Sequence, residues 1–307
     1  GEMAYYRNEG NGQFSRVRGR DLDRTYQRDL TGIVTIPKQD GATVLVGYSN
    51  YERGPKDPAS PSKILVFEAD AQGLRQVNEL TFGEGAVGPL ALADVDGDDD
   101  LDLFAGGRHV PGGYPASASS KLYVNENGQF RLDDALSRPF ESVGMVAGAS
   151  FADFNRDGAP DLVLATEWGP VRYYQNQGDG RFVDRTAERG LDTYTGLWRG
   201  IDVGDLNGDG WLDLVVTNWG WNSKFGHPPG APHNVESAGL AHPLRVYYAD
   251  FDRNGAMDLF ESHYHDGRDE YVPYAGLSEV GKAMPYVRRQ MQSYEAYSKA
   301  SLPEIIG

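Results

Sequence analysis

The chain has 307 residues, of which 39% are hydrophobic and 11% are aromatic, and its formal net charge is −16. This aromatic content argues against a disordered chain, and the negative charge argues against a nucleic-acid partner, whose phosphates attract basic surfaces. Because there is no cysteine, disulfides, thiolate zinc sites and cysteine nucleophiles are excluded. No apolar run approaches the roughly 18 residues that a transmembrane helix needs.

In chain order, the first predicted element is a hairpin over residues 4–14, with the sequence AYYRNEGNGQF. An alternating apolar strand leads into a glycine-containing turn, after which a second strand starts. Similar segments recur at residues 64–74, 121–130 and 171–182. Period-two alternation bounded by such turns is the signature of a β-hairpin. The first residues, GEMAYY, lack a charged-then-apolar export signal, so we expect any such signal to lie outside this sequence.

An acidic motif recurs between these hairpins. Four copies, at residues 91–104, 150–164, 202–216 and 247–260, align without gaps. Their first acidic residues are separated by 59, 52 and 45 positions (94 to 153, 153 to 205, and 205 to 250). An upstream copy at residues 35–49 has Ile36, Lys38 and Val44 at ligand positions, while Asp40 and Gly41 keep the turn. We interpret it as a structural repeat without a metal.

Together, an acidic hairpin and the hairpin that follows it give about four strands for every 45–60 residues, which is typical of a propeller blade. We therefore predict an all-β fold: a β-propeller of four-stranded blades over residues 1–272. A β-sandwich is the alternative. Residues 4–14 form a second hairpin without a first, so they either complete the last blade or belong to a longer propeller.

The C-terminal part, residues 273–307, is predicted to be a short helical segment. From Leu277 to Ile306 the glycines and the strand alternation fade. Val287, Met291, Tyr294 and Tyr297 recur at helical spacing, and Pro285 stands near the expected helix start. We expect one short amphipathic helix that packs on the edge of the propeller.

Within each acidic motif, oxygen-bearing side chains fall at positions 1, 3, 5 and 9, and the following residues start a strand. Oxygen ligands without sulfur or imidazole suit Ca²⁺ best, with Mg²⁺ as the second choice. Metal-free acidic turns are the alternative. Position 7 varies freely, as expected if it contributes its backbone carbonyl. The predicted ligands are Asp94, Asp96, Asp98 and Asp102 (loop one); Asp153, Asn155, Asp157 and Asp161 (loop two); Asp205, Asn207, Asp209 and Asp213 (loop three); and Asp250, Asp252, Asn254 and Asp258 (loop four).

The segments DFNRDGAPDL and DLNGDGWLDL resemble the FG-GAP repeat, also called the VCBS-type or integrin α N-terminal-like repeat. The resemblance covers residues 1 to about 272. It implies a β-propeller with Ca²⁺ in about four of its loops, in a protein that is extracellular, periplasmic or at the cell surface. The tail, PYVRRQMQSYEAYSKASLPEIIG, resembles segments of long bacterial FG-GAP proteins with an ASPIC/UnbV module, which implies a fragment of a larger exported protein.

Aromatic and polar residues follow the second strand of each acidic hairpin, where an integrin-like blade has its opposite rim. They form a candidate ligand platform, or alternatively they pack between neighbouring blades. His263 and His265 could also bind a transition metal, although no third ligand is evident. The candidate ligand-binding residues are Arg108, His109, Trp168, Trp219, Trp221, His263 and His265.

The function expected from these features is a calcium-binding scaffold for extracellular ligand recognition or cell adhesion. Its partner would be a protein or a glycan. The sequence has no Gly-x-Ser-x-Gly, His-Glu-x-x-His or phosphate-loop motif, so we expect no enzymatic activity. The alternatives are a carbohydrate-binding lectin and a carbohydrate-active enzyme built on a propeller, because fold alone excludes neither.

Overall fold

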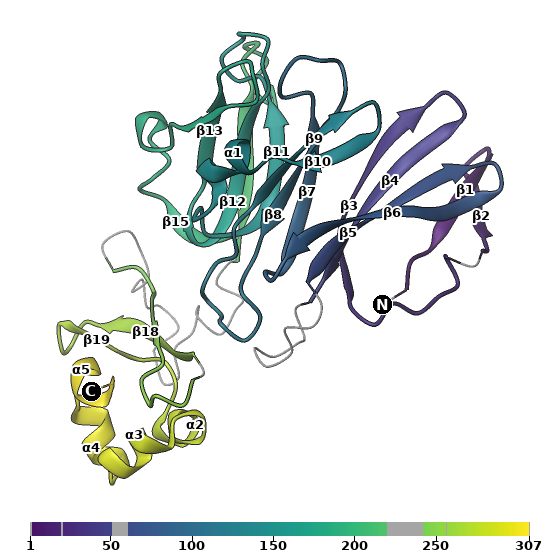
Figure 1. Ribbon diagram of the computed structural model, residues 1–307. Helices are drawn as coiled ribbons and strands as arrows, with labels where there is room; N and C mark the ends of the chain where they lie inside the picture. Colours follow the sequence, from purple (N-terminus) through teal and green to yellow (C-terminus); the bar gives the residue numbers. More distant parts are fainter. Residues whose placement is uncertain (1, 20, 51–60, 220–241, 256, 307) are drawn as a thin grey trace. The chain divides into compact units, whose positions relative to one another are not determined.

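The computed structural model describes residues 2–19, 21–50, 61–219, 242–255 and 257–306 (Figure 1). It divides into two compact units. Unit 1 comprises Gly1–Pro111 and Ala116–Asn218, and unit 2 comprises Gly112–Pro115 and Trp219–Gly307. Strands make up most of the regular secondary structure in the described residues, as the sequence predicts. Among the described residues, no helix combines the length and the hydrophobicity needed to cross a bilayer.

Unit 1 contains three four-stranded antiparallel arrays in which each strand pairs with the next one along the chain. The predicted order of an acidic hairpin followed by a second hairpin is confirmed in the second and third arrays. The strands are β3 (Asp29–Lys38), β4 (Gly41–Ser49), β5 (Ser62–Asp70) and β6 (Gly73–Gly83) in sheet one; β7 (Val87–Ala93), β8 (Asp102–Gly107), β9 (Lys121–Glu126) and β10 (Gln129–Leu132) in sheet two; and β11 (Met145–Ala152), β12 (Asp161–Pro170), β13 (Arg172–Asn176) and β14 (Phe182–Asp184) in sheet three.

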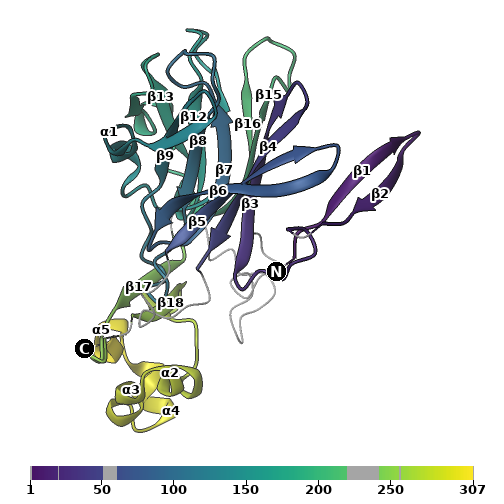
Figure 2. The same ribbon diagram turned by 45° about the vertical axis from the view of Figure 1, so that its right-hand side comes forward.

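Two further hairpins of unit 1 each have two strands in the part of the chain that the structure describes. The first is the ribbon β1 (Tyr5–Gly10) and β2 (Gln13–Val17), which adjoins sheet one and appears as a separate ribbon in Figure 2. The second is the acidic hairpin β15 (Thr195–Gly204) and β16 (Asp213–Asn218), which pairs with the far end of β12. Short helical turns complete the unit: α1 (Asp134–Ser137), η1 (Arg138–Phe140) and η2 (Ala187–Arg189).

The first strands of consecutive repeats, β3, β7, β11 and β15, lie next to one another because glycines allow close backbone approach. A Cβ atom on Gly32 would lie 2.8 Å from the Leu90 nitrogen, and one on Gly148 would lie 3.0 Å from the Arg199 oxygen. Each of these strands also carries a register shift near the contact. The repeats therefore follow one another as blades do, although the described strands do not close into a ring.

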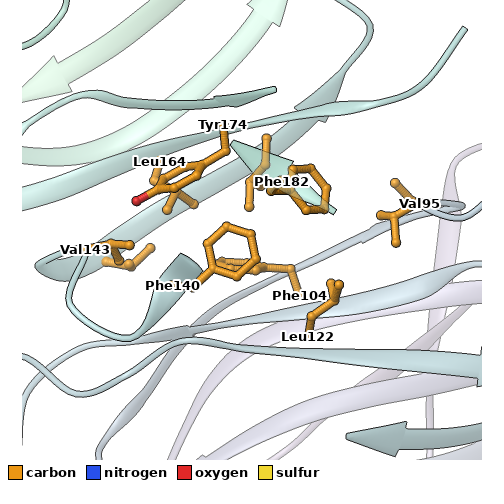
Figure 3. Packing of buried hydrophobic residues seen from close by; sticks show 11 residues of the cluster. Val95, Phe104, Leu122, Phe140, Val143, Leu164, Tyr174 and Phe182 are labelled. Carbon is orange, nitrogen blue, oxygen red and sulfur yellow. The ribbon is translucent and has the colours of Figure 1, made fainter. Parts of the chain in front are cut away.

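Hydrophobic clusters fill the space between consecutive sheets. Between sheets two and three the fully buried Phe140 of η1 contacts the rings of Phe104, Tyr174 and Phe182, with centroid separations of 5.3, 5.0 and 5.5 Å (Figure 3). A second cluster joins sheets one and two. The strand alternation seen in the sequence thus places the apolar faces of successive sheets against each other.

The upstream repeat at residues 35–49 forms a hairpin, as predicted, but its loop is much shorter than the acidic loops. Lys38 pairs with Gly41, so only two residues make the turn between β3 and β4. Ile36 and Val44 therefore lie inside the strands and occupy no loop position, which corrects their alignment with metal ligands. Lys38 instead forms an ion pair with Glu68 at 2.8 Å.

Unit 2 combines strands with short helices around one core. Its elements are β17 (Arg245–Ala249), β18 (Asp258–His265), β19 (Glu270–Pro273), α2 (Leu277–Ala283), α3 (Pro285–Gln290), α4 (Tyr294–Lys299) and α5 (Leu302–Ile306). Phe260 of β18 shares its cluster with Val287 of α3 and Ile305 of α5. The single amphipathic helix predicted here is wrong in detail. The chain leaves helical geometry at Met291, and the Ser293 side chain caps a new helix by accepting a hydrogen bond from the Ala296 N–H.

Candidate metal centre

The four acidic loops share positive φ angles at the same two positions. Loop one joins β7 to β8, loop two joins β11 to β12, loop three joins β15 to β16, and loop four joins β17 to β18. In every loop, positions 4 and 6 have positive φ, a conformation that favours glycine. Position 4 is occupied by Gly97, Arg156, Gly208 and Arg253, and position 6 by Asp99, Gly158, Gly210 and Gly255. The repeat therefore specifies a three-dimensional loop as well as a sequence.

These turns direct backbone N–H groups at the carboxylate of position 1. In loop one, Asp94 Oδ1 accepts hydrogen bonds from the N–H groups of Gly97 (2.7 Å) and Asp98 (3.1 Å), and Asp94 Oδ2 accepts one from Asp99 (3.0 Å). Asp153, Asp205 and Asp250 are held in the same way. Successive N–H groups in such turns form a concave anion site, which fixes the orientation of the first ligand.

The side chains at positions 3 and 5 also shape the loop. Asn155, Asn207 and Asp252 at position 3 accept from the backbone N–H two residues later. At position 5, Asp98 accepts from the Asp100 N–H at 2.9 Å, and Asp157 and Asp209 make the equivalent bonds. The second oxygen of Asp157 accepts from the Asn155 side-chain nitrogen at 2.8 Å, and that of Asp209 accepts from the Asn207 side-chain nitrogen at 3.1 Å.

Position 9 ties the loop to the rest of its sheet. Asp102 is completely buried; its Oδ2 accepts from the Val95 N–H at 2.9 Å, and its Oδ1 accepts from the Asn125 N–H of β9 at 2.9 Å. Burial raises the pKa of Asp102 to about 6. Asp161 in loop two is equally buried and accepts from the Asn176 N–H, and burial raises its pKa as well.

In loops one and four, three carboxylates converge. The ligand atoms of Asp94, Asp96 and Asp102 all lie within 4.8 Å of one another, as do those of Asp250, Asp252 and Asp258. In loops two and three an asparagine takes the third position, so the corresponding set contains an amide oxygen. The fifth-position residue of loop one, Asp98, lies outside the converging group of that loop.

One buried oxygen in loop one has no partner. Within the described residues, Asp96 Oδ1 is buried and accepts no hydrogen bond. Burial and the neighbouring charge of Asp98 raise the pKa of Asp96. An unpaired buried carboxylate oxygen is costly unless a cation or a donor meets it. The residues present therefore fit a hard cation that prefers oxygen ligands, such as Ca²⁺.

Two of the predicted rim residues contribute to packing between repeats. Arg108 at the end of sheet two and Arg199 of β15 both form ion pairs with Glu167 of β12, whose side chain is 3% exposed. His109 is buried, and burial lowers its pKa to about 4. For Arg108 and His109, packing is therefore the role that the structure shows. Glu167 and Arg199 were not predicted as site residues, because their contact joins strands from separate repeats.

The remaining rim candidates differ in their exposure and in their contacts. Trp168 adopts a positive φ of 59° and is half-buried, and Trp219 is 53% exposed. Trp221 lies outside the described residues. His263 packs edge-on against Tyr274, and His265 is exposed. Among the described residues, no converging group of three metal ligands includes a histidine.

Asn125 and Asn176, which donate their backbone N–H groups to the ninth-position carboxylates, were not predicted as site residues. A signal was present: in YVNENG and YYQNQG, Asn125 stands one residue before the end of its strand and Asn176 ends its strand, close to the turn of the second hairpin. The side-chain nitrogen of Asn176 also donates to the Val95 carbonyl of loop one at 2.9 Å, and the Gly180 N–H donates to the same oxygen at 2.8 Å. Loop one is thus held by both its own sheet and the next.

The model of the FG-GAP-like repeat matches residues 94–164 and 153–216. Each match begins at the first aspartate of an acidic loop. The chain carries FG-GAP-like repeats. The FG-GAP-like repeat predicted from the sequence is thereby confirmed for residues 94–216, whereas the association with bacterial ASPIC/UnbV proteins stays a prediction.

Among known proteins, the FG-GAP-like chain is similar to cartilage acidic protein 1. It is 31% identical to the mouse (Mus musculus) protein and 30% identical to the human (Homo sapiens) protein, over 219 residues that cover 69% of this chain. It is also 29% identical to phosphatidylinositol-glycan-specific phospholipase D of Rattus norvegicus over 198 residues, which cover 55% of this chain and 23% of that protein. The matched part spans 30% of the length of the cartilage acidic proteins.

Proposed function

We propose that this chain is a calcium-binding, propeller-type scaffold that recognises a protein or glycan ligand outside the cell. The observation that carries the proposal is the convergence of Asp94, Asp96 and Asp102, with Asp96 Oδ1 buried and unpartnered in the described part of the chain. The FG-GAP-like family match supports it, because the matched segments contain loops one, two and three. The other loops repeat the positive φ angles at positions 4 and 6.

The residues that would hold Ca²⁺ are the side chains at positions 1, 3, 5 and 9 of each loop, together with the carbonyl of position 7. When bound, the ion would supply positive charge that offsets the repulsion between the carboxylates. The chain itself orients the ligands: backbone N–H groups hold position 1, and Asp102 joins its loop to the Asn125 N–H of the next strand. In the repeats of loops one and two, calcium would therefore fasten the first hairpin to the second.

A ligand-recognition role is supported by exposed apolar side chains around loop three and β16. Leu206, Trp211 and Val215 are 65%, 50% and 47% exposed. Large exposed aromatic side chains bind both protein partners and sugars. Extracellular calcium modules commonly bind their ion at about 10⁻⁴–10⁻³ M, so an extracellular, periplasmic or cell-surface setting would keep such sites filled.

The alternative is a lectin or a carbohydrate-active enzyme. The exposed Trp219 favours sugar stacking, and the likeness to a protein named as a phospholipase D keeps catalysis among the functions to test. A glycan-binding screen with turnover measured beside binding separates these functions. Bond cleavage by the purified chain would overturn the non-enzymatic scaffold, and loss of glycan binding in Trp219→Ala would identify a lectin.

Calcium binding itself is tested by thermal unfolding with excess EDTA, with millimolar Ca²⁺ and with matched Mg²⁺, alongside calorimetric titration. Ligands that bind only the folded state raise its stability by mass action. We expect a clear upward shift with Ca²⁺ and a smaller one with Mg²⁺. No shift, together with no calcium in the purified protein, would mean that the loops are metal-free turns.

A further inference from the structure

Loops two and three are joined by one side chain. Arg156, at position 4 of loop two, extends to loop three, where its guanidinium donates a hydrogen bond to the Gly210 carbonyl. The same group lies over the Trp211 ring, with 3.9 Å between the guanidinium carbon and the ring centroid. A Cβ atom on Gly210 would lie 3.1 Å from the Arg156 guanidinium. The glycine at position 6 therefore leaves space for this contact.

Both ends of the contact connect directly to predicted calcium ligands. In loop two, the Arg156 N–H donates to Asp153 Oδ1 at 2.7 Å. In loop three, the Gly210 N–H donates to Asp205 Oδ2 at 2.9 Å, and the Trp211 N–H donates to Asp209 Oδ1 at 2.8 Å. Trp211 is also the position-7 residue, whose carbonyl is a predicted ligand. Arg156 thus links the first ligand of loop two to the backbone that orders loop three.

Loop three depends on this contact because it has little other support. In loops one and two, the ninth-position carboxylate also accepts an N–H from the third strand of its sheet. Asp213 accepts only the Leu206 N–H of its own loop among the described residues. Asp205, Asn207 and Asp209 are exposed. Within the described ranges, Arg156 supplies the only hydrogen bond to loop three from outside the β15–β16 hairpin.

We propose that Arg156 couples calcium binding at loops two and three, so that an ion in one loop favours binding of an ion in the other. This inference rests on the proposed calcium-binding function. An ion at Asp153 would fix the backbone from which Arg156 extends, and Arg156 would then hold the Gly210–Trp211 segment in its ligand-presenting form. Such a coupling is reciprocal, because each ion must change the affinity for the other by the same factor.

The conformation of Arg156 gives the proposal a matched control. Arg156 has a φ of 63° at a position that is glycine in loops one and three, and Arg253 of loop four has a φ of 58° at the same position. Among the described residues, Arg253 makes no hydrogen bond, ion pair or ring contact. Replacing either arginine with glycine relaxes the same backbone strain. Only Arg156→Gly also removes a contact between loops.

The experiment follows loop three through Trp211, one of five tryptophans in the chain. The full chain is labelled with a fluorinated tryptophan, and Trp211→Phe assigns the Trp211 signal in the fluorine NMR spectrum. Calcium is then titrated into the wild type, Arg156→Gly and Arg253→Gly. Because exposed cation–π contacts change an equilibrium constant about two- to five-fold, we expect the Trp211 midpoint to rise by that factor in Arg156→Gly alone.

A second part of the experiment prevents calcium binding at loop two while Arg156 stays in place. Asp157→Ala, which disables loop two, should raise the Trp211 midpoint by a similar factor, whereas Asp98→Ala, which disables loop one, should leave it in place. Equal midpoints in the wild type, Arg156→Gly and Asp157→Ala, with calcium still bound by calorimetry, would overturn the coupling and leave the calcium sites intact. No calcium response in any variant or in calorimetry would overturn both the coupling and the proposed function.

Discussion

Sheet two and the β15–β16 hairpin contain the same motif in opposite surroundings. On β8, Asp102 and Phe104 are completely buried, whereas Val215, which aligns with Phe104 on β16, is 47% exposed. The loops nevertheless match: the Val95 N–H lies 2.9 Å from Asp102 Oδ2, and the Leu206 N–H lies 3.0 Å from Asp213 Oδ2. The local sequence therefore determines the conformation of the loop. The third strand and the neighbouring sheet determine how deeply the loop carboxylate and the strand side chains are buried.

The largest difference between the two regions should appear in core truncation. Phe104→Ala removes a ring that packs against Phe140 and Phe151, and we expect it to lower the free energy of unfolding by about 3–5 kcal/mol. Val215→Ala, at the aligned position, should change it by less than about 0.5 kcal/mol, because half of that side chain is already in water. Chemical denaturation of both variants in Ca²⁺ measures the contrast. Similar losses would mean that β16 is covered in solution.

Acid should destabilise the buried region through His109. Burial lowers its pKa from the ordinary 6.5 to about 4, so between these pH values the unfolded chain binds a proton that the folded chain does not. The stability contributed by the neutral imidazole is therefore complete above pH 6.5 and is lost as the pH falls towards 4.

Denaturation of the wild type and of His109→Gln across that pH window tests this prediction. The variant should show a shallower loss of stability on acidification. Parallel pH curves for the two proteins would show that His109 is accessible to protons in the folded state and would contradict its burial at the end of sheet two.

The sequence predicted the hairpins and their order because alternation and turn residues are local signals. It also located the loop residues, since each loop is closed by bonds such as those from Gly97 and Asp99 to Asp94. It did not predict Glu167 with Arg108 and Arg199, or Arg156 with Trp211, because these contacts join residues 32 to 59 positions apart. The helical break at Met291 was missed because Val287, Met291 and Tyr294 keep helical spacing across it.

A smaller effect is expected where the repeats meet at Glu167. Glu167→Ala removes the carboxylate that pairs with Arg108 and Arg199, whose side chains are 33% and 38% exposed. Water can reach both cations, so we expect a loss of about 1–2 kcal/mol, below that for a fully buried pair. The double variant Arg108→Ala with Arg199→Ala is the control. If the ion pairs account for the loss, adding Glu167→Ala to this double variant should lower the free energy of unfolding little further. An additive loss of stability would show that Glu167 acts through other contacts.

The smallest predicted change in stability is that of Asp96→Ala, and its sign depends on whether calcium is present. In EDTA, Asp96→Ala removes a buried, unpartnered oxygen from beside Asp94 and Asp102, so the variant should be as stable as the wild type or up to about 1 kcal/mol more stable. In millimolar Ca²⁺ the order should reverse, because the wild type gains binding energy at loop one that the variant lacks. Asp213→Ala should produce a weaker reversal, since its loop is exposed and less constrained. A variant that is less stable in EDTA and equally less stable in Ca²⁺ would mean that Asp96 supports the loop without binding an ion.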